Sequence, residues 1–209
     1  MAEGLAAWTG LLVAHPNLAR IPETLRGLAQ LQAFAPGETV FRQGERPKAM
    51  LCVLSGEIHL VRRSREGGEV ILQRSRGGFF AEASLESKAY HCDAVAAAEG
   101  RLLRFPLRAF REAIETDPGF RSAWIAHLAD EVRKLRAQSE RLSLHGAAER
   151  IVHYLEAEGK DGVLVLTQTR KSWAAELGLS HEALYRTLRR LQAEGVISVA
   201  GERIALRRA

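Results

Sequence analysis

The sequence predicts an α+β protein built from a β-rich N-terminal region, one long helix and a C-terminal region in which helices and short strands alternate. Three observations along the 209 residues support this prediction. Between residues 30 and 105, glycines recur at short intervals and separate apolar runs of strand length. After residue 118 the apolar period becomes that of a helix, and after residue 146 short helical and strand-like segments follow one another.

The composition is that of an ordinary globular protein, with 46% hydrophobic and 26% charged residues. Its two cysteines, Cys52 and Cys92, are too few for a disulfide framework or a four-cysteine metal cluster. No apolar run approaches the ~20 residues of a membrane span, and the N-terminus lacks a signal-peptide pattern. We therefore expect a cytoplasmic protein that makes no membrane contact.

The glycine-punctuated region predicts a closed or double-sheet β structure. Short helices are expected before it, because Pro16 and Pro22 interrupt the first 30 residues. The apolar run at residues 50–54 has the length of a buried strand. Cys52 lies within that run, so we expect its thiol in the core.

A long helix is predicted after Pro118-Gly119, because apolar residues follow a heptad pattern over nearly three repeats. A helix of about 25 residues would be ~38 Å long, and its apolar seam needs a cover. The seam indicates a helix–helix dimer, and the alternative is packing against the chain's own β region. His127 on this helix is expected to be structural or solvated. The predicted dimerisation residues are Ile125, Leu128, Val132, Leu135 and Leu142.

The final third of the chain alternates helix and turn. The predicted order is a helix ended by Gly159, a short strand over residues 163–166, a helix from Thr169 to Leu177, a tight turn at residues 178–180, a helix capped by Ser180 that runs to Glu194, and a hairpin around residues 200–202. The two helices around Gly178 form a helix-turn-helix, and the hairpin forms a wing.

The second helix of this helix-turn-helix has the chemistry to enter a major groove of DNA. Residues 169–209 hold eight basic and four acidic residues, so they carry +4 of the net charge of +5. Arg186 can pair bidentately with guanine, and Glu182 can accept from cytosine. The alternative is that Glu182 and Arg186 form a common surface ion pair at i,i+4, which is compatible with base contact because the pair would hold the arginine for the base. The predicted DNA contacts are Thr169, Arg170, Ser180, His181, Glu182, Tyr185, Arg186 and Arg189, of which Arg170, Ser180 and Arg189 are assigned to phosphates.

From about residue 30 to its end, the chain resembles the cyclic-AMP receptor protein/FNR (Crp/Fnr) family of bacterial transcription regulators. The resemblance is carried by FAPGETVFRQGE, MLCVLSGEIHLV, FFAEASLESKAYHCDAVAA and the helix-turn-helix TRKSWAAELGLSHEALYRTLRRLQAEGVI. It implies a β-roll sensor domain at residues 1–117 (a jelly roll like that of cyclic-nucleotide-binding domains), a dimerisation helix at 118–144 and a winged helix-turn-helix at 145–209. It also implies a homodimer on palindromic double-stranded DNA, with RNA polymerase as a partner and activation favoured over repression.

The sequence departs from the family pattern where members bind a cyclic nucleotide. In those members a Gly-Glu pair takes the ribose hydroxyl and an Arg-Ser pair takes the cyclic phosphate, whereas this chain has Ala81-Glu82 and Cys92-Asp93. The charge-assisted phosphate contact is therefore lost. The helix residues that would meet the purine are also replaced, by Leu135-Arg136. We expect that cyclic AMP is not the effector, and an iron–sulfur cluster is excluded because it needs four thiolates.

The candidate effector pocket is taken to comprise Leu72, Glu82, His91, Cys92, Asp93 and Leu135. If residues 90–93 belong to a strand, alternation puts Cys92 on one face and both His91 and Asp93 on the other. Four roles remain open for Cys92: a buried thiol, a redox-sensing thiolate, a metal or haem ligand with His91, or a contact to a small organic effector. A regulator that needs no effector is a further alternative, so the cofactor is unknown.

The predicted function is a homodimeric, sequence-specific DNA-binding regulator that does not use cyclic AMP. One alternative is a weakly specific architectural DNA-binding protein. Another is a regulator gated by a metal, haem or thiol redox signal at the Cys92 region. An enzyme is not expected, because the sequence has no nucleophile elbow, phosphate loop or zinc-hydrolase motif.

Overall fold

The structure, a computed structural model, describes residues 2–63 and 69–207. The chain divides into two compact units, Met1–Leu128 and Ala129–Ala209, and the long helix contributes residues to both. Among the helices of the described residues, none combines the length and apolar character that crossing a membrane requires.

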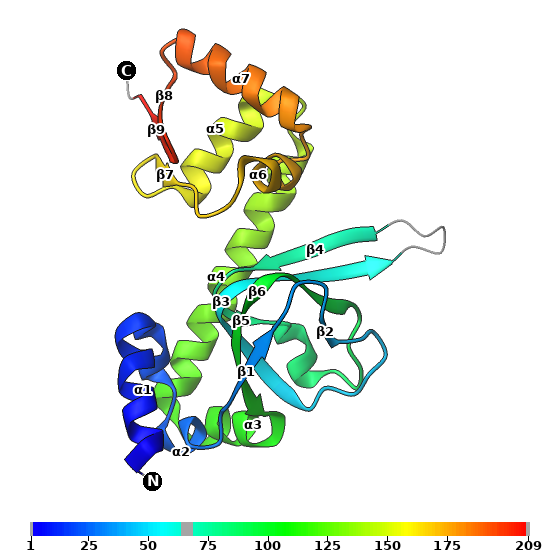
Figure 1. Ribbon diagram of the computed structural model, residues 1–209, viewed down its shortest axis with the longest axis vertical. Helices are drawn as coiled ribbons and strands as arrows, with labels where there is room; N and C mark the ends of the chain where they lie inside the picture. Colours follow the sequence, from blue (N-terminus) through cyan, green and yellow to red (C-terminus); the bar gives the residue numbers. More distant parts are fainter. Residues whose placement is uncertain (1, 64–68, 208–209) are drawn as a thin grey trace. The chain divides into compact units, whose positions relative to one another are not determined.

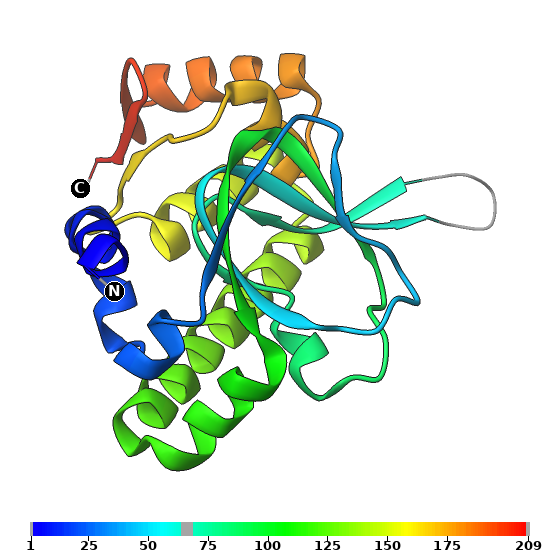
Figure 2. The same ribbon diagram turned by 60° about the horizontal axis from the view of Figure 1, so that its bottom comes forward.

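The N-terminal unit is an antiparallel β-roll preceded by three short helical segments (Figure 1). The helical segments are α1 (Ala2–Ala14), η1 (Pro16–Arg20) and α2 (Glu23–Arg26). The strands are β1 (Gln30–Phe34), β2 (Thr39–Phe41), β3 (Ala49–Arg63), β4 (Glu69–Ser75), β5 (Gly78–Phe80) and β6 (Asp93–Pro106). The sheet order is β1-β6-β3-β4, with β2 also paired to β6 and β5 to β3, so the sheet curls on itself (Figure 2).

The long strands β3 and β6 pair along most of their lengths and form the frame of the roll. Because side chains alternate along a strand, the apolar run of β3 is buried on both of its faces. Met50, Cys52 and Leu54 belong to one core cluster, and Leu51 and Val53 belong to a second. The predicted core position of Cys52 is confirmed, since this residue is only 2% exposed.

Residues 90–92 do not belong to a strand, so the condition for applying strand alternation to residues 90–93 is met by Asp93 only. Strand β6 begins only at Asp93, and the residues before it lie outside the ladder. The backbone of Tyr90 is instead hydrogen-bonded to a distant turn: its N–H donates to the carbonyl of Glu45, and its carbonyl accepts from the N–H of Gly44. These contacts take the backbone out of the β3–β6 pairing, so strand alternation does not govern Cys92.

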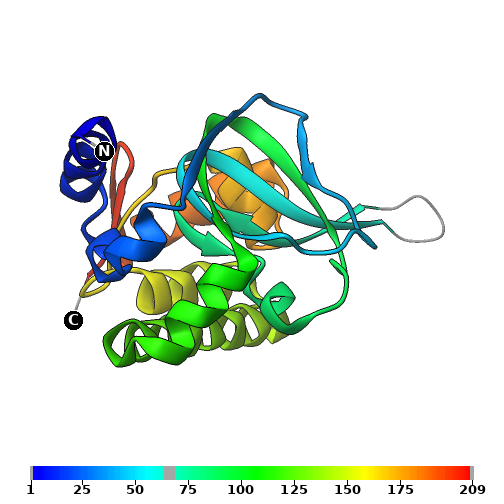
Figure 3. The same cartoon turned by 90° about the horizontal axis from the view of Figure 1, so that it is seen from below.

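Helices α3 (Leu107–Thr116) and α4 (Pro118–Ser143) follow the roll. The carboxylate of Asp117 accepts from the N–H of Phe120 at 2.8 Å and so caps α4. Phe110 of α3 contacts the rings of Phe120 and Trp124, where the two helices run side by side (Figure 3). With 26 residues, α4 is about 39 Å long, which agrees with the predicted long helix.

The predicted seam of α4 lies largely on the surface of the chain. Its apolar side chains are between 46% and 60% exposed, and they are Ile125, Val132, Leu135 and Leu142. Leu128 differs from them, because it is partly buried against the core cluster that holds Trp124. Of the predicted seam residues within the N-terminal unit, Leu128 packs against that unit's core, as the alternative expects, and Ile125 does not.

The C-terminal unit contains the end of α4 and a winged helix-turn-helix. Its further elements are α5 (Ala147–Glu158), β7 (Val163–Val165), α6 (Arg170–Glu176), α7 (His181–Ala193), β8 (Ile197–Ala200) and β9 (Arg203–Leu206). The strands form an antiparallel sheet in the order β7-β9-β8, and β8 and β9 make the predicted wing. Trp173, Leu155 and Leu184 are fully buried in its core. The predicted α+β architecture is thereby confirmed.

Candidate nucleic-acid interface and effector site

Helix α7 separates a buried apolar face from an exposed polar one. Ser180 caps it, because the Oγ atom accepts from the N–H of Ala183 at 3.1 Å. The buried residues recur at helical spacing and are Leu184, Thr187, Leu188 and Leu191. The exposed residues between them are His181, Glu182, Tyr185, Arg186 and Arg189. The packing of α7 on the core thus leaves all five predicted polar side chains of this helix at the surface.

The alternative Glu182–Arg186 ion pair is not found among the described residues. In the part of the chain that the structure describes, the ion pair on α7 joins Arg190 to Glu194 at 4.0 Å. Glu182 and Arg186 are each exposed and make no hydrogen bond or ion pair with the described residues. Both groups therefore keep their hydrogen-bonding capacity for a partner outside the chain.

Arg170 connects α6, α7 and the wing. Its Nη2 donates to the carbonyl of Gly201, in the turn of the wing, at 2.7 Å. The same guanidinium lies 5.6 Å from the ring centre of Tyr185. The imidazole of His181, one helical turn earlier on α7, contacts the same ring. Thr169 caps α6 by accepting from Ser172 at 3.2 Å. Arg170 therefore links the wing to α7 within the chain, a role that the sequence did not predict.

In the N-terminal unit, Glu82 is bound by a residue of α4. The carboxylate Oε1 lies 2.8 Å from Nε2 of His127, and the Glu82 side chain is only 11% exposed. The rings of Phe79 and Trp124 contact the imidazole and hold it in place. Ala81, just before Glu82, has φ +59°, a left-handed backbone conformation that disfavours any residue with a Cβ. The pairing of His127 with Glu82 was missed, because the two residues lie 45 positions apart.

The residues around Cys92 have separate environments. Cys92 is 4% exposed and belongs to the second core cluster, against which Leu72 packs; burial, the largest influence, raises the pKa of its thiol. Asp93 accepts from the backbone N–H of Gln43 at 2.7 Å. His91 is exposed, and its carbonyl accepts from the guanidinium of Arg62 at 3.3 Å. Only Leu72 and Cys92, among these predicted pocket residues, share one cluster.

Two further observations bear on the predicted effector pocket. Leu135 is 56% exposed and belongs to the C-terminal unit. Among the described residues, no three His, Cys, Asp or Glu side chains converge in a way that could hold a metal ion.

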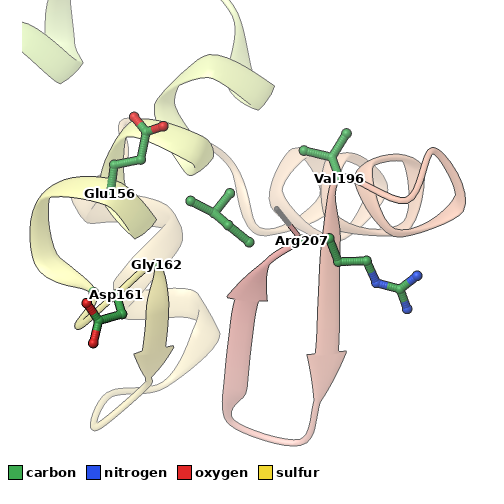
Figure 4. A pocket seen from close by; sticks show the side chains of 7 residues that line it. Glu156, Asp161, Gly162, Val196 and Arg207 are labelled. Carbon is green, nitrogen blue, oxygen red and sulfur yellow. The ribbon is translucent and has the colours of Figure 1, made fainter. Parts of the chain in front are cut away.

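An open groove of about 500 Å³ lies within the C-terminal unit. It is lined by Glu156, Gly159, Asp161, Gly162, Val196, Leu206 and Arg207. Figure 4 shows Glu156 and Asp161 on the side of α5, and Val196 and Arg207 on the side of the wing. The groove thus borders the short turn that connects α5 to β7.

Comparisons with known proteins match both units. Residues 31–117 match the family "Cyclic nucleotide-binding domain", and residues 149–209 match the "Crp-like helix-turn-helix domain". The "Cyclic AMP receptor protein" of Thermus thermophilus is 28% identical over 183 residues, which cover 86% of this chain and 85% of the relative. The "cAMP-activated global transcriptional regulator CRP" of Pasteurella multocida is 24% identical and covers 84% and 89%. The solved structure of DNR from Pseudomonas aeruginosa is 27% identical, covers 96% and 93%, and has a TM-score of 0.52.

Proposed function

The chain belongs to the Crp/Fnr family of DNA-binding transcription regulators, which are not enzymes, and from that premise we propose that it is a homodimeric activator that reads a palindromic DNA site without cyclic AMP. The observation that carries the proposal is the exposed polar face of α7, opposite its buried leucines. A regulator of this kind acts where the chromosome is, which places it in the cytoplasm.

Base recognition is assigned to α7 in the major groove. Arg186 pairs with guanine O6 and N7, and Glu182 accepts from cytosine N4. Their lack of partners within the described chain supports these roles. The phosphate contacts that position the helix come from Thr169, Arg170, Ser180 and Arg189, and His181 and Tyr185 complete the face.

The dimer is assigned to the exposed seam of α4. The seam side chains that are open to solvent are Ile125, Val132, Leu135 and Leu142. Covering them with the same helix of a second copy buries apolar surface and so stabilises the dimer. Two-fold symmetry then places the half-sites about one helical turn apart, ~34 Å. We assign RNA polymerase as the further partner through which a DNA-bound dimer activates transcription.

Independence from cyclic AMP is supported by what occupies the three pocket positions. The carboxylate of Glu82 already has His127 as its partner. Cys92, which stands where a phosphate-binding arginine is found in nucleotide-binding members, is buried in the core, and the carboxylate of Asp93 next to it would repel a phosphate. A calorimetric titration should therefore detect no binding of cyclic AMP at micromolar concentrations, and a micromolar Kd would overturn this part of the proposal.

We favour regulation without a dissociable effector over gating by a metal, haem or thiol redox signal at the Cys92 region. The raised pKa of the Cys92 thiol argues against a redox-sensing thiolate. The burial of Cys92 beside an exposed His91 argues against a shared metal or haem.

The test is selection of bound DNA from a random pool with purified protein at physiological salt. An enriched palindrome is the expected result, and without added ligand it also supports an effector-free regulator. Binding that enriches no sequence and collapses as salt rises would point to the architectural alternative. Failure to bind would mean a regulator that is locked off without a signal, and would contradict the effector-free mode.

A further inference from the structure

One arginine of α5 contacts three backbone carbonyls that lie far apart in the sequence. The Nε of Arg150 donates to the carbonyl of Leu144 at 2.9 Å. Its Nη1 lies 3.2 Å from the carbonyl oxygen of Leu177 and 3.3 Å from that of Gly178. Leu144 follows the last residue of α4, whereas Leu177 and Gly178 form the turn between α6 and α7. All three acceptors and Arg150 lie within the C-terminal unit.

Two of the three acceptors, the carbonyls of Leu144 and Leu177, directly follow the last residues of α4 and α6, and the third, that of Gly178, belongs to the turn after α6. The last carbonyls of a helix have no partners within it and carry the negative end of the helix dipole. Arg150 therefore caps α4 and α6 together. A guanidinium can do this because its donors point in fixed, divergent directions, whereas the single ammonium of a lysine cannot reproduce that fork.

Two neighbouring features accommodate the Arg150 guanidinium: the glycine at position 178 and a second α5 contact to the α4–α5 link. A Cβ added to Gly178 would lie 3.0 Å from Nη1 of Arg150 and 3.8 Å from Cδ2 of Leu142, on the last turn of α4. The absence of a side chain at Gly178 thus leaves room for the guanidinium, whereas the contact with Leu142 would be an ordinary van der Waals distance. Next to Arg150, Glu149 accepts from the N–H of Gly146 at 3.0 Å, so two consecutive α5 residues bind the α4–α5 link.

We propose that Arg150 is a positioning residue for DNA recognition, which fixes the start of α7 relative to the end of α4. Ser180, which begins α7, lies only two residues beyond the Gly178 carbonyl that Arg150 holds. Arg150 touches no base in this scheme and acts through the turn. The inference rests on the proposed sequence-specific DNA binding and adds a residue that orients the helix responsible for it.

The experiment compares the full chain with Arg150→Lys, which keeps the charge, and Arg150→Met, which keeps the length of the side chain. Each is titrated with the palindrome that the wild type selects and with a scrambled duplex of equal composition. The matched control is Arg133→Met, which removes one arginine from an exposed position on α4. Thermal unfolding of every variant shows whether weaker DNA binding comes from loss of the fold or from a displaced α7 in a folded protein. Arg150→Gln, which keeps an N–H₂ donor, is the second neutral variant if Arg150→Met does not fold.

Because a displaced α7 would lose its bidentate base contact in each half-site, both Arg150→Lys and the neutral variant should bind the palindrome about tenfold more weakly. Binding to the scrambled duplex should change less than about threefold, since phosphate contacts tolerate a tilted helix. Unchanged affinity for the palindrome, or equal losses on both duplexes, would overturn the proposal. If the wild type binds DNA but enriches no palindrome, the proposed sequence-specific function itself fails.

Discussion

The polar side chains of the β-roll and those of α7 are placed in opposite ways. Glu82 is largely buried and its carboxylate is paired with His127, and the carboxylate of the half-buried Asp93 accepts from the backbone N–H of Gln43. Glu182 and Arg186 are turned outward, and no described residue pairs with either. A polar group buried in a fold must find a partner within it, whereas an exposed one stays available to a ligand. The comparison supports the proposal that DNA binding uses the exposed face of α7, whereas Glu82 and Asp93 make contacts within the N-terminal unit itself.

The largest expected effect concerns the two buried thiols of the N-terminal unit. Burial, with a smaller contribution from Glu82, raises the pKa of Cys52 from 9.0 to about 12, so its thiolate fraction at neutral pH falls roughly a thousandfold. Burial also raises the pKa of Cys92. Both residues should resist alkylation by iodoacetamide at pH 7.5 in the native protein and react in concentrated urea. Fast alkylation of Cys92 in the native protein would show that this thiol is accessible and reactive, and would restore the thiol-redox alternative.

The next effect separates the two faces of α7. Leu188→Ala removes a fully packed side chain from the core that holds Trp173, so the C-terminal unit should lose about 2–5 kcal/mol of stability. Urea unfolding followed by circular dichroism measures this loss. Tyr185→Ala on the exposed face is the control, and it should shift stability far less. Equal losses for the two variants would mean that α7 is not oriented as described.

Two arginine variants can distinguish residues of the exposed face that contact bases from residues that contact phosphates. Arg186→Ala should cost roughly 1–3 kcal/mol of binding to the selected palindrome and relax its preference at one G·C pair in each half-site. Arg189→Ala should weaken binding to all sequences about equally and reduce the salt dependence. Repeating the random-pool selection with each variant gives both results. An unchanged preference with Arg186→Ala would show that another residue reads that base pair.

The Glu82–His127 hydrogen bond of the N-terminal unit can be tested with a double-mutant cycle. His127→Ala leaves the poorly exposed Glu82 carboxylate without its partner, which should cost about 1–3 kcal/mol of stability. Adding Glu82→Gln removes the uncompensated charge and should recover part of that loss. Chemical unfolding of the wild type, both single variants and the double variant measures the coupling. Additive losses would show that the hydrogen bond contributes nothing to the roll.

The smallest effect comes from the backbone beside Glu82. Ala81 pays for a left-handed conformation that glycine adopts freely. Ala81→Gly should therefore raise the stability of the roll by about 0.5–1 kcal/mol, after the greater entropy of glycine in the unfolded chain is subtracted. The thermal midpoint of unfolding measures this change. A lower midpoint would mean that the Ala81 methyl group contributes packing that outweighs the strain.

The elements of this protein could be predicted from its sequence because their causes are local. The heptad after Pro118 predicted α4, and Gly178 with Ser180 predicted the turn and cap of α7, since spacing, a left-handed residue and an N-cap hydroxyl all act within a few residues. The same periodicity assigned the exposed face of α7. Family resemblance then supplied the order of the domains.

Tertiary structure alone decided the partners of the side chains. Glu82 meets His127 across 45 residues, Arg170 reaches Gly201 across 31, and Arg150 reaches Leu177 across 27. Residues 90–92 lie outside a strand for the same reason, because a turn 45 residues earlier takes the backbone hydrogen bonds of Tyr90. Local spacing fixes which face a residue occupies, but a buried polar group is satisfied by whichever donor or acceptor the complete fold brings to it.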